Sequence, residues 1–225
     1  MLYLASKSPR RTELLSQIGA EHEVINIHVD EFLDAAKSSR DNVESLSLLK
    51  CQEGIRYILS ENMLLLPVLT ADTIVVLGEE IFGKPESKED AIRMLMQLSG
   101  KIHSVITGVT IGIVESDQAQ FHTISVESKV EFSILSEHEC QKYCTTMEPF
   151  DKAGGYGIQG YGSTFVKNIS GSYSNIVGLP MHEVTELFKK LNIIGRLDFL
   201  IFFIIDIVII LSVDIILLLR LIEID

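Results

Sequence analysis

Residues 2–12, with the sequence LYLASKSPRRT, join a short apolar strand to the start of a helix with apolar residues at helical spacing. Arg10 and Arg11 fall in the first turn of that helix. A helix N-terminus carries partial positive charge and unpaired N–H groups, so two arginines there call for an anion. Together with the hydroxyls of Ser6 and Ser8, they predict a cradle for a polyphosphate. The alternative is a solvated basic turn capped by Ser8.

Composition limits the kind of phosphate that such a cradle would hold. The chain has 225 residues, with 19 Lys and Arg against 31 Asp and Glu, and its formal net charge is −12. Because so acidic a chain repels a nucleic-acid backbone, the expected ligand is a small molecule and not a nucleic-acid polymer. The length and 47% hydrophobic residues allow one sizeable domain or two small lobes.

Cysteine usage predicts a reducing compartment. Cys51, Cys140 and Cys144 are odd in number and lack the spacing of zinc ligands. No basic and apolar leader precedes the first expected strand, so we expect no secretory signal and a cytoplasmic location.

Strand and helix patterns alternate along the chain, which predicts an α/β fold. Asp72 lies inside the most apolar of the expected strands, at a predicted break formed by residues 71–73. The expected strands span residues 2–5, 22–29, 68–77, 81–82, 102–115, 121–135 and 164–169, and the expected helices span residues 9–18, 42–59, 87–98, 136–148 and 181–191.

Several of these residues are candidates for chemistry. A carboxylate is rarely buried in an apolar strand without a partner, so Asp72 is expected to bind a divalent cation or to take a proton from water. Glu31 is the expected second carboxylate. The alternative for Asp72 is a bend or bulge in which the carboxylate pairs with a lysine or a backbone N–H.

Two lysines are candidates for offsetting phosphate charge. Lys84 lies in the stiff loop Gly83-Lys84-Pro85, and Lys50 lies on an expected helix among leucines. The alternatives are an exposed turn lysine for Lys84 and a snorkelling lysine for Lys50. In the glycine-rich segment 151–160, Gln159 offers an amide donor and acceptor that could read a base edge.

Taken together, the motifs resemble those of the Maf family over residues 2–192. The matching segments follow one another in the order and spacing of that family. They are Ser6 to Arg11, Ala71 to Thr73, Gly83 to Pro85, Leu98 to Gly100, His103 to Thr107, Glu148 with Pro149, Asp151 to Gly154, and Gly178 to Pro180.

The resemblance implies a nucleoside triphosphate pyrophosphatase that uses Mg²⁺ or Mn²⁺ to release a nucleoside monophosphate and pyrophosphate. It also implies an elongated mixed sheet flanked by helices, two lobes around a deep cleft, and a homodimer. Glu31 and Asp72 would hold the metal, and Asp72 would accept the proton of the attacking water. The alternative from another functional class is a nucleotide-binding regulator of cell division or septum formation, in which hydrolysis is incidental.

The same resemblance implies the roles of the remaining site residues. Ser6, Arg10 and Arg11 would bind phosphate, and Lys50 and Lys84 would neutralise it. The helix around Lys50 is less basic and less alanine-rich than is usual in the family, so the chain departs from the family pattern there.

Substrate preference is also implied. The pairing of Asp72-Thr73 with Gly157-Ile158-Gln159 resembles the branch that acts on dTTP and UTP, which makes Arg10, Thr73 and Gln159 the specificity positions. A neutral amide can pair with the imide edge of uracil or thymine.

The chain departs from the family pattern after its expected last helix. We divide it into a Maf-like domain, residues 1–194, and an apolar C-terminal extension, residues 195–225, interrupted by Asp198, Asp206, Asp214, Arg220 and Glu223. Between residues 199 and 219, the free-energy balance for membrane insertion, apolar residues against Asp206 and Asp214, is near zero or slightly favourable. Three interpretations stay open: a non-native extension, a C-terminal membrane anchor, and a buried or dimer-covering helix.

Overall fold

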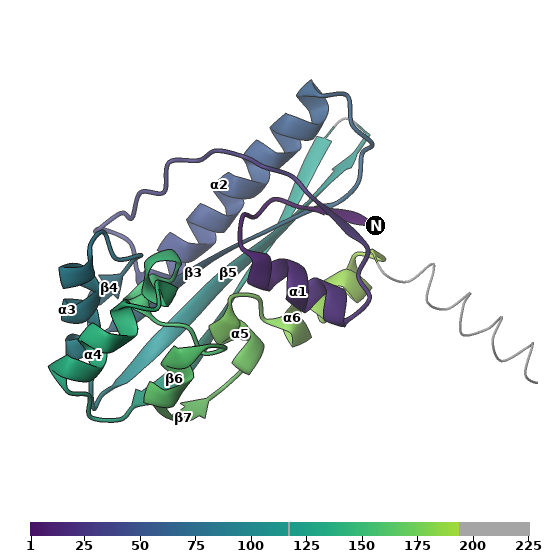
Figure 1. Ribbon diagram of the computed structural model, residues 1–225. Coiled ribbons are helices and arrows are strands. Elements are labelled where there is room, and N and C mark those ends of the chain that lie inside the picture. The colour runs from purple at the N-terminus through teal and green to yellow at the C-terminus, as the bar shows by residue number, and fades with distance from the viewer. Residues whose placement is uncertain (117, 194–225) are drawn as a thin grey trace, which may run out of the picture. The chain divides into compact units, whose positions relative to one another are not determined.

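The computed structural model describes residues 1–116 and 118–193 (Figure 1). Met1–Val184 forms one compact unit that holds the whole described sheet, and a second unit begins at Thr185, within helix α6 (Met181–Lys190). The expected extension, residues 195–225, lies outside the described residues. No described helix is both long and apolar enough to cross a membrane.

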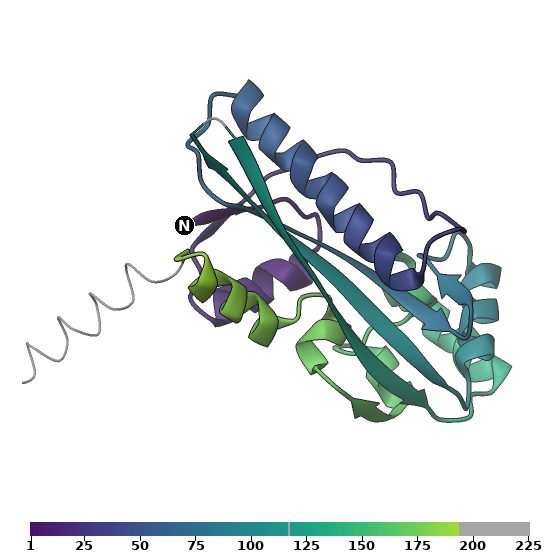
Figure 2. The ribbon, with the colours of Figure 1, turned by 180° about the vertical axis from the view of Figure 1, so that it is seen from behind.

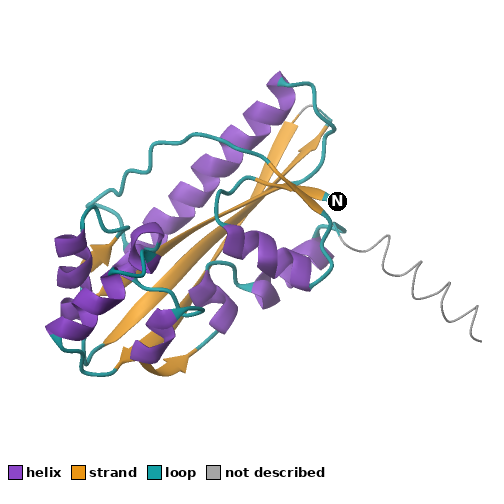
Figure 3. Ribbon diagram, in the orientation of Figure 1, coloured by secondary structure: helices purple, strands orange, loops and turns teal. Residues whose placement is uncertain are grey.

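A seven-stranded mixed sheet runs through the described part of the chain (Figure 3). Its order is β2-β1-β3-β5-β6-β7, with β4 paired to β3. β1 is parallel to both β2 and β3, and the other pairs are antiparallel. The strands are β1 (Leu2–Leu4), β2 (His22–Val24), β3 (Val68–Leu77), β4 (Glu80–Phe82), β5 (Ile102–Glu115), β6 (Gln118–Phe132) and β7 (Val166–Ser170). The predicted α/β class and mixed sheet are confirmed, and the two lobes stay a prediction.

The helices expected from residues 87 and 136 begin where the sequence predicts, whereas α2 begins at Ser39, before the expected residue 42, and α4 ends at Cys144, before the expected residue 148. Ser38, Ser87 and Ser136 each accept a hydrogen bond from the backbone N–H three residues on, and at Ser136 the side chain of Glu139 completes a capping box. The other α-helices are α1 (Pro9–Gln17), α2 (Ser39–Ser60), α3 (Lys88–Leu98), α4 (Glu137–Cys144) and α5 (Tyr173–Val177), and 3₁₀ turns span Glu148–Asp151, Ala153–Gly155 and Tyr161–Phe165.

Helix α2 packs on one face of the sheet, and α1 and α5 lie on the opposite face (Figures 1 and 2). Gly108 on β5 permits the close approach of α2, because a Cβ there would come within 2.5 Å of the Val43 carbonyl oxygen. The neighbouring Thr107 points the other way and donates to the backbone carbonyl of Asn175 on α5. Consecutive residues of β5 thus contact helices on opposite faces of the sheet, as the alternation of side chains along a strand requires.

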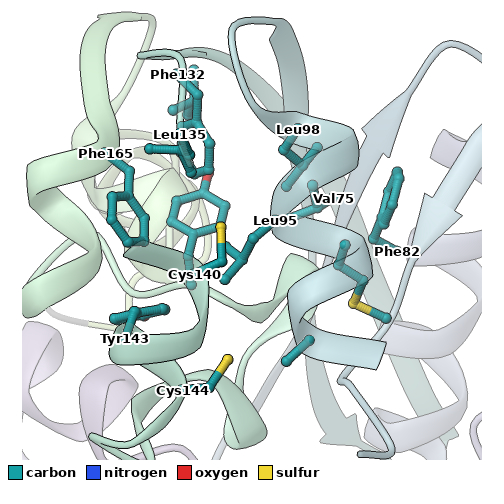
Figure 4. Packing of buried hydrophobic residues seen from close by; sticks show 14 of the residues in the cluster. Val75, Phe82, Leu95, Leu98, Phe132, Leu135, Cys140, Tyr143, Cys144 and Phe165 are labelled. Atoms are coloured by element: carbon teal, nitrogen blue, oxygen red, sulfur yellow. The ribbon is translucent and has the colours of Figure 1, made fainter. Parts of the chain in front are cut away.

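The largest described core cluster lies where α3 and α4 pack near the ends of β3 and β5 (Figure 4). Aromatic rings from distant segments meet there edge to face, with Phe132 and Tyr156 centroids 4.7 Å apart. Its buried members include Val75, Phe82, Leu95, Leu98, Phe132, Leu135, Cys140, Tyr143, Cys144 and Phe165. All three cysteines are buried and free, as the expectation of reduced thiols requires.

Two expected features of the strands are wrong. The strand expected over residues 22–29 ends at Val24, because its partner β1 ends at Leu4 and only one further bond, from the Ile25 N–H to the Leu4 carbonyl, continues the pairing. β3 is not broken at Asp72: its pairing with β5 runs without interruption from Val68 to Val76.

Candidate active site

A cavity of about 570 Å³ opens beside the middle of β3. All nine side chains expected in the site line it, although they come from six separate segments of the chain. They are Ser6, Arg10, Arg11, Glu31, Lys50, Asp72, Thr73, Lys84 and Gln159. The roles assigned to them stay predictions, but the structure brings all of them together.

The cavity forms where β3 has a free edge. β1 pairs with β3 only as far as Leu69, and β4 pairs with it only from Val75. Within the described residues, no strand covers residues 71–74 on that edge. Asp72 and Thr73 point to opposite faces of the sheet, and both line the cavity at this unpaired edge.

The topology also favours a ligand at this place. From the carboxyl end of β1, the chain passes through α1 to β2, and it then returns through α2 to β3 on the other side of β1. Because α1 and α2 lie on opposite faces (Figures 1 and 2), the two connections diverge at the carboxyl end of β1, where residues 5–11 line the cavity. Such switch points are the usual ligand sites of open α/β sheets.

Lys50 connects the two expected carboxylates. Its Nζ lies 2.6 Å from Asp72 Oδ1 and 2.7 Å from Glu31 Oε1. The Lys50 and Asp72 side chains are only 12% and 11% exposed, so Lys50 does not extend its charged end into solvent. Asp72 pairs with a lysine, as its alternative expected, but it does so in an unbroken strand and not at a bulge. Burial by itself would raise the pKa of Glu31, but the hydrogen bond and charge of Lys50, with the charges of Lys84 and Arg11, lower it.

Arg11 is held on three sides. Its Nε donates to the Gly178 carbonyl at 2.8 Å, and its Nη1 and Nη2 donate to the hydroxyls of Ser6 and Thr73 at 3.1 and 3.2 Å. Burial lowers the pKa of this guanidinium, and the charge of Asp72 opposes that shift. Ser6 also accepts from the Ser8 N–H, whereas Ser8 itself makes no side-chain cap, so the alternative of a turn capped by Ser8 is wrong.

A chain of hydroxyls supports Thr73 from behind. Thr107 donates to the Asn175 carbonyl at 3.0 Å, and its oxygen lies 2.9 Å from that of Thr73. A hydroxyl has one proton, so Thr107 accepts from Thr73, and Thr73 in turn accepts from Arg11. The Thr73 proton is therefore committed to the protein, and Thr73 can offer a ligand only an acceptor.

Arg10 lies farther out, where it pairs with Asp151 at 2.8 Å. Asp151 also pairs with Lys152, at 2.5 Å. Burial would raise the pKa of Asp151, but the hydrogen bonds from Lys152 and Arg10 lower it. The charge that the sequence places at the start of α1 is thus balanced by a carboxylate 141 residues away.

Lys84 and Gln159 are exposed at the cavity. The loop before Lys84 is fixed by its neighbour: the Gly83 carbonyl accepts from the Gly154 N–H at 2.9 Å. Gly154 has a φ of +70°, and a Cβ there would touch the Val75 side chain at 3.0 Å. The glycine-rich segment therefore turns tightly beside β3, as expected.

The carboxylates fit a divalent cation that shares its coordination with phosphate. Glu31 and Asp72 both present an oxygen to one point, which Lys50 Nζ occupies. Magnesium is commonly bound by one or two carboxylates together with water and substrate phosphates. No cluster of three or more His, Cys, Asp or Glu suited to a metal occurs among residues 1–116 and 118–193.

Sequence reasoning assigned no role to several residues of the cavity. Lys7, Lys152 and Tyr156 line it, and the backbone of Gly178 and the hydroxyl of Thr107 hold its arginine and threonine. Most lie in segments that the sequence marks as motifs, including residues 103–107, 151–154 and 178–180. The motifs therefore indicate that these residues belong to the site. They do not indicate which residues form hydrogen bonds with one another, because those bonds join segments that are distant in sequence.

Comparisons with known proteins agree with this geometry. The family model described as Maf-like protein matches residues 1–191. A protein of Ralstonia nicotianae named dTTP/UTP pyrophosphatase is 44% identical over 195 residues, which cover 84% of this chain and 93% of that protein. Proteins with the same name from Caldicellulosiruptor bescii and Thermosipho africanus are 42% and 45% identical, over 85% and 83% of this chain and 94% and 91% of their own lengths.

The matched region contains every element that forms the cavity. The expected resemblance is confirmed over nearly the whole of the described chain, by the family model and by relatives at more than 40% identity. This chain belongs to the Maf family.

Proposed function

We propose that this protein hydrolyses dTTP and UTP to the nucleoside monophosphate and pyrophosphate. The observation that carries the proposal is the charge of the cavity: six cationic side chains and three carboxylates, those of Glu31, Asp72 and Asp151, line it in a chain whose net charge is −12. The cations are Lys7, Arg10, Arg11, Lys50, Lys84 and Lys152. Such a concentration of positive charge in an acidic protein favours a small polyanion.

The arrangement also fits an attack on phosphorus. A triphosphate held by the arginines and Lys84 would lie against Asp72, the buried carboxylate that can orient water and accept its proton. Lys50 keeps that carboxylate in place and adds positive charge where the transferred group becomes more negative. A bound Mg²⁺ or Mn²⁺, held by Glu31 and Asp72, would polarise the phosphate oxygens.

The proposed preference for pyrimidines rests on the three cavity residues that are expected to contact the base. Gln159 presents an amide, Thr73 presents an acceptor, and Arg10 lies nearby at the start of α1. An acceptor and an amide suit the imide edge of uracil and thymine, which offers one N–H between two carbonyls. The printed names of the relatives, dTTP/UTP pyrophosphatase, point to the same substrates.

The alternative of a nucleotide-binding regulator is not favoured. A protein that only senses a nucleotide needs the phosphate-binding cations, but it has no need for a buried carboxylate beside them. The pair Asp72 and Lys50 is nearly excluded from solvent at the cavity, which is the arrangement expected of an enzyme.

Location and assembly belong to the same proposal. The three free cysteines support a reducing compartment, and we propose the cytoplasm. A homodimer remains part of the proposal through the family resemblance. The membrane contact considered for residues 195–225 concerns residues that the structure does not describe.

A screen of nucleoside triphosphates with detection of pyrophosphate tests the function. In the presence of Mg²⁺ or Mn²⁺, dTTP and UTP should give the highest kcat/KM, and Asp72→Asn should abolish turnover while the thermal unfolding temperature changes little. Asp41→Asn, an exposed carboxylate outside the cavity, serves as the matched control. Release of no pyrophosphate from any triphosphate would refute the proposal.

A further inference from the structure

The carboxylate of Glu148 lies inside the loop that carries Gln159. Its Oε2 accepts from the Tyr161 N–H at 2.8 Å, and its Oε1 accepts from the Gly162 N–H at 3.1 Å. Oε1 also accepts from the Tyr143 hydroxyl at 2.8 Å. That hydroxyl accepts in turn from the Gly157 N–H at 3.1 Å. One carboxylate and one phenol therefore bind both ends of the loop 157–162.

The glycines of this loop lie in close contact with these two side chains and with other groups. A Cβ on Gly157 would lie 2.7 Å from Lys152 Cε and 2.8 Å from Glu148 Oε1, and a Cβ on Gly162 would lie 2.8 Å from the Gly157 carbonyl oxygen and 2.9 Å from the Tyr143 hydroxyl. A Cβ on Gly160 would collide with Glu148 Oε2. These contacts are closer than real Cβ atoms show, so the loop is wrapped around Glu148 and Tyr143 without spare room.

Gln159 sits between the two bound ends of this loop and lines the cavity. Its own side chain is exposed, so its position depends on the backbone that carries it. Glu148 is not among the residues that line the cavity, yet it binds two of the three backbone N–H groups that follow Gln159, those of Tyr161 and Gly162. Burial raises the pKa of Tyr143, so the phenol stays protonated and keeps donating to Glu148.

We propose that Glu148 and Tyr143 are positioning residues for substrate selection, because they hold the loop 157–162 so that Gln159 faces the base. This inference rests on the proposed function, in which Gln159 reads the base. It assigns to Glu148 a role in selectivity and no part in the chemistry at phosphorus. Disturbing the loop should therefore raise KM and weaken discrimination between bases more than it lowers kcat.

Glu148→Gln is the informative substitution. Tyr161 and Gly162 donate to different oxygens of the carboxylate, and an amide has only one acceptor oxygen. In either orientation, the amide NH₂ would face an N–H donor of the loop. The substitution keeps the volume of the side chain and removes one of its two hydrogen bonds to the backbone of the loop. Tyr143→Phe removes the bond to the Gly157 N–H from the other end.

The experiment measures kcat and KM for UTP and CTP, which have bases of similar size but opposite hydrogen-bonding edges. Glu148→Gln should raise KM for UTP and reduce the UTP to CTP ratio of kcat/KM by about tenfold, with a smaller change in kcat. Tyr143→Phe should act in the same direction. Glu131→Gln, a carboxylate paired with Lys167 outside the cavity, should leave all four constants unchanged.

A double-mutant cycle separates positioning from general damage to the fold. In a Gln159→Ala background, Glu148→Gln and Tyr143→Phe should cause no further loss of selectivity. A further loss there, or unchanged selectivity in both single variants, would overturn the inference while leaving the proposed hydrolysis intact. If Gln159→Ala itself leaves selectivity unchanged, both the base-reading role and this inference fail. Should Glu148→Gln not fold, the cycle with Tyr143→Phe decides the question.

Discussion

Lys50 on α2 and Asp72 on β3 form a nearly buried ion pair, with 2.6 Å between Nζ and Oδ1. The two residues lie 22 positions apart in sequence, and they meet because α2 packs along β3 and β5 (Figure 2). Because Lys50 also binds Glu31, one cation holds both carboxylates that are expected to act on the ligand. The pair therefore links the packing of α2 to the chemistry of the cavity.

Lys50→Met should remove the ion pairs that Lys50 forms with Glu31 and Asp72. We expect kcat to fall roughly a hundredfold, since a positive charge beside the reacting phosphate is lost. The hydrogen bond and charge that lower the pKa of Glu31 also disappear, so that pKa should rise, as measured by NMR titration of the side-chain carboxyl carbon. Lys37→Met, which removes an exposed lysine on the approach to α2, should change neither quantity. An unshifted Glu31 titration in Lys50→Met would contradict the assignment.

Thr107→Val tests the hydroxyl chain behind Thr73. Valine keeps the shape but removes the donor to Asn175 and the acceptor for Thr73. Loss of these buried bonds should reduce the free energy of unfolding by about 1–3 kcal/mol and raise KM for UTP, because Thr73 and Arg11 lose their fixed orientation. Thr107→Ser retains the hydroxyl and should recover most of the KM effect. Equal KM values for Thr107→Val and the unmodified protein would show that Thr73 needs no support.

Gly108→Ala tests the contact between α2 and the sheet. A Cβ at this position would meet the Val43 carbonyl oxygen at 2.5 Å and its carbon at 2.7 Å, both backbone atoms. The helix would have to move away, and we expect the free energy of unfolding in urea to fall by about 1–3 kcal/mol. Gly83→Ala, where a Cβ meets nothing within 4 Å, is the matched control for stability. Equal stability of the two variants would exclude a tight helix–sheet contact.

His103 should make the protein less stable in mild acid. Burial lowers its pKa from 6.5 to about 4, and its Nε2 lies 2.8 Å from the Tyr156 hydroxyl. Between those two values the unfolded chain binds a proton that the folded chain does not, so stability falls as the pH drops from 6.5 toward 4. The full loss corresponds to about 3 kcal/mol.

Urea unfolding at several pH values measures this effect. His103→Gln should flatten the pH dependence of the unfolding free energy between pH 6.5 and 4. His138→Gln, at an exposed position on α4, should leave that dependence unchanged. A pH dependence that is the same in His103→Gln and in the unmodified protein would rule out His103 as its source.

Local patterns predicted those parts of the fold that depend on nearby residues. The capping serine at 136, the stops at Gly19 and Gly100, and the hairpin between β5 and β6 all depend on backbone geometry within a few positions. The short helix α5 was missed, because five residues are too few to show helical periodicity.

The site was predictable as a set of residues but not as a set of contacts. Asp72 stood out because a carboxylate is costly in an apolar strand, and the structure places it beside a lysine. The predicted strand break at Asp72 was wrong, because β3 continues through this residue. The edge of β3 is free there because β1 ends before Asp72 and β4 begins after it, which the sequence around Asp72 does not show. The pairing of Arg11 with Gly178, 167 residues apart, likewise depends on the complete fold.

The most direct test of the central claim is hydrolysis of UTP in water labelled with ¹⁸O, followed by mass spectrometry of both products. Attack of water on the α-phosphorus predicts that the label enters UMP and that pyrophosphate stays unlabelled. Label in pyrophosphate, or formation of UDP and inorganic phosphate in place of UMP and pyrophosphate, would contradict the account.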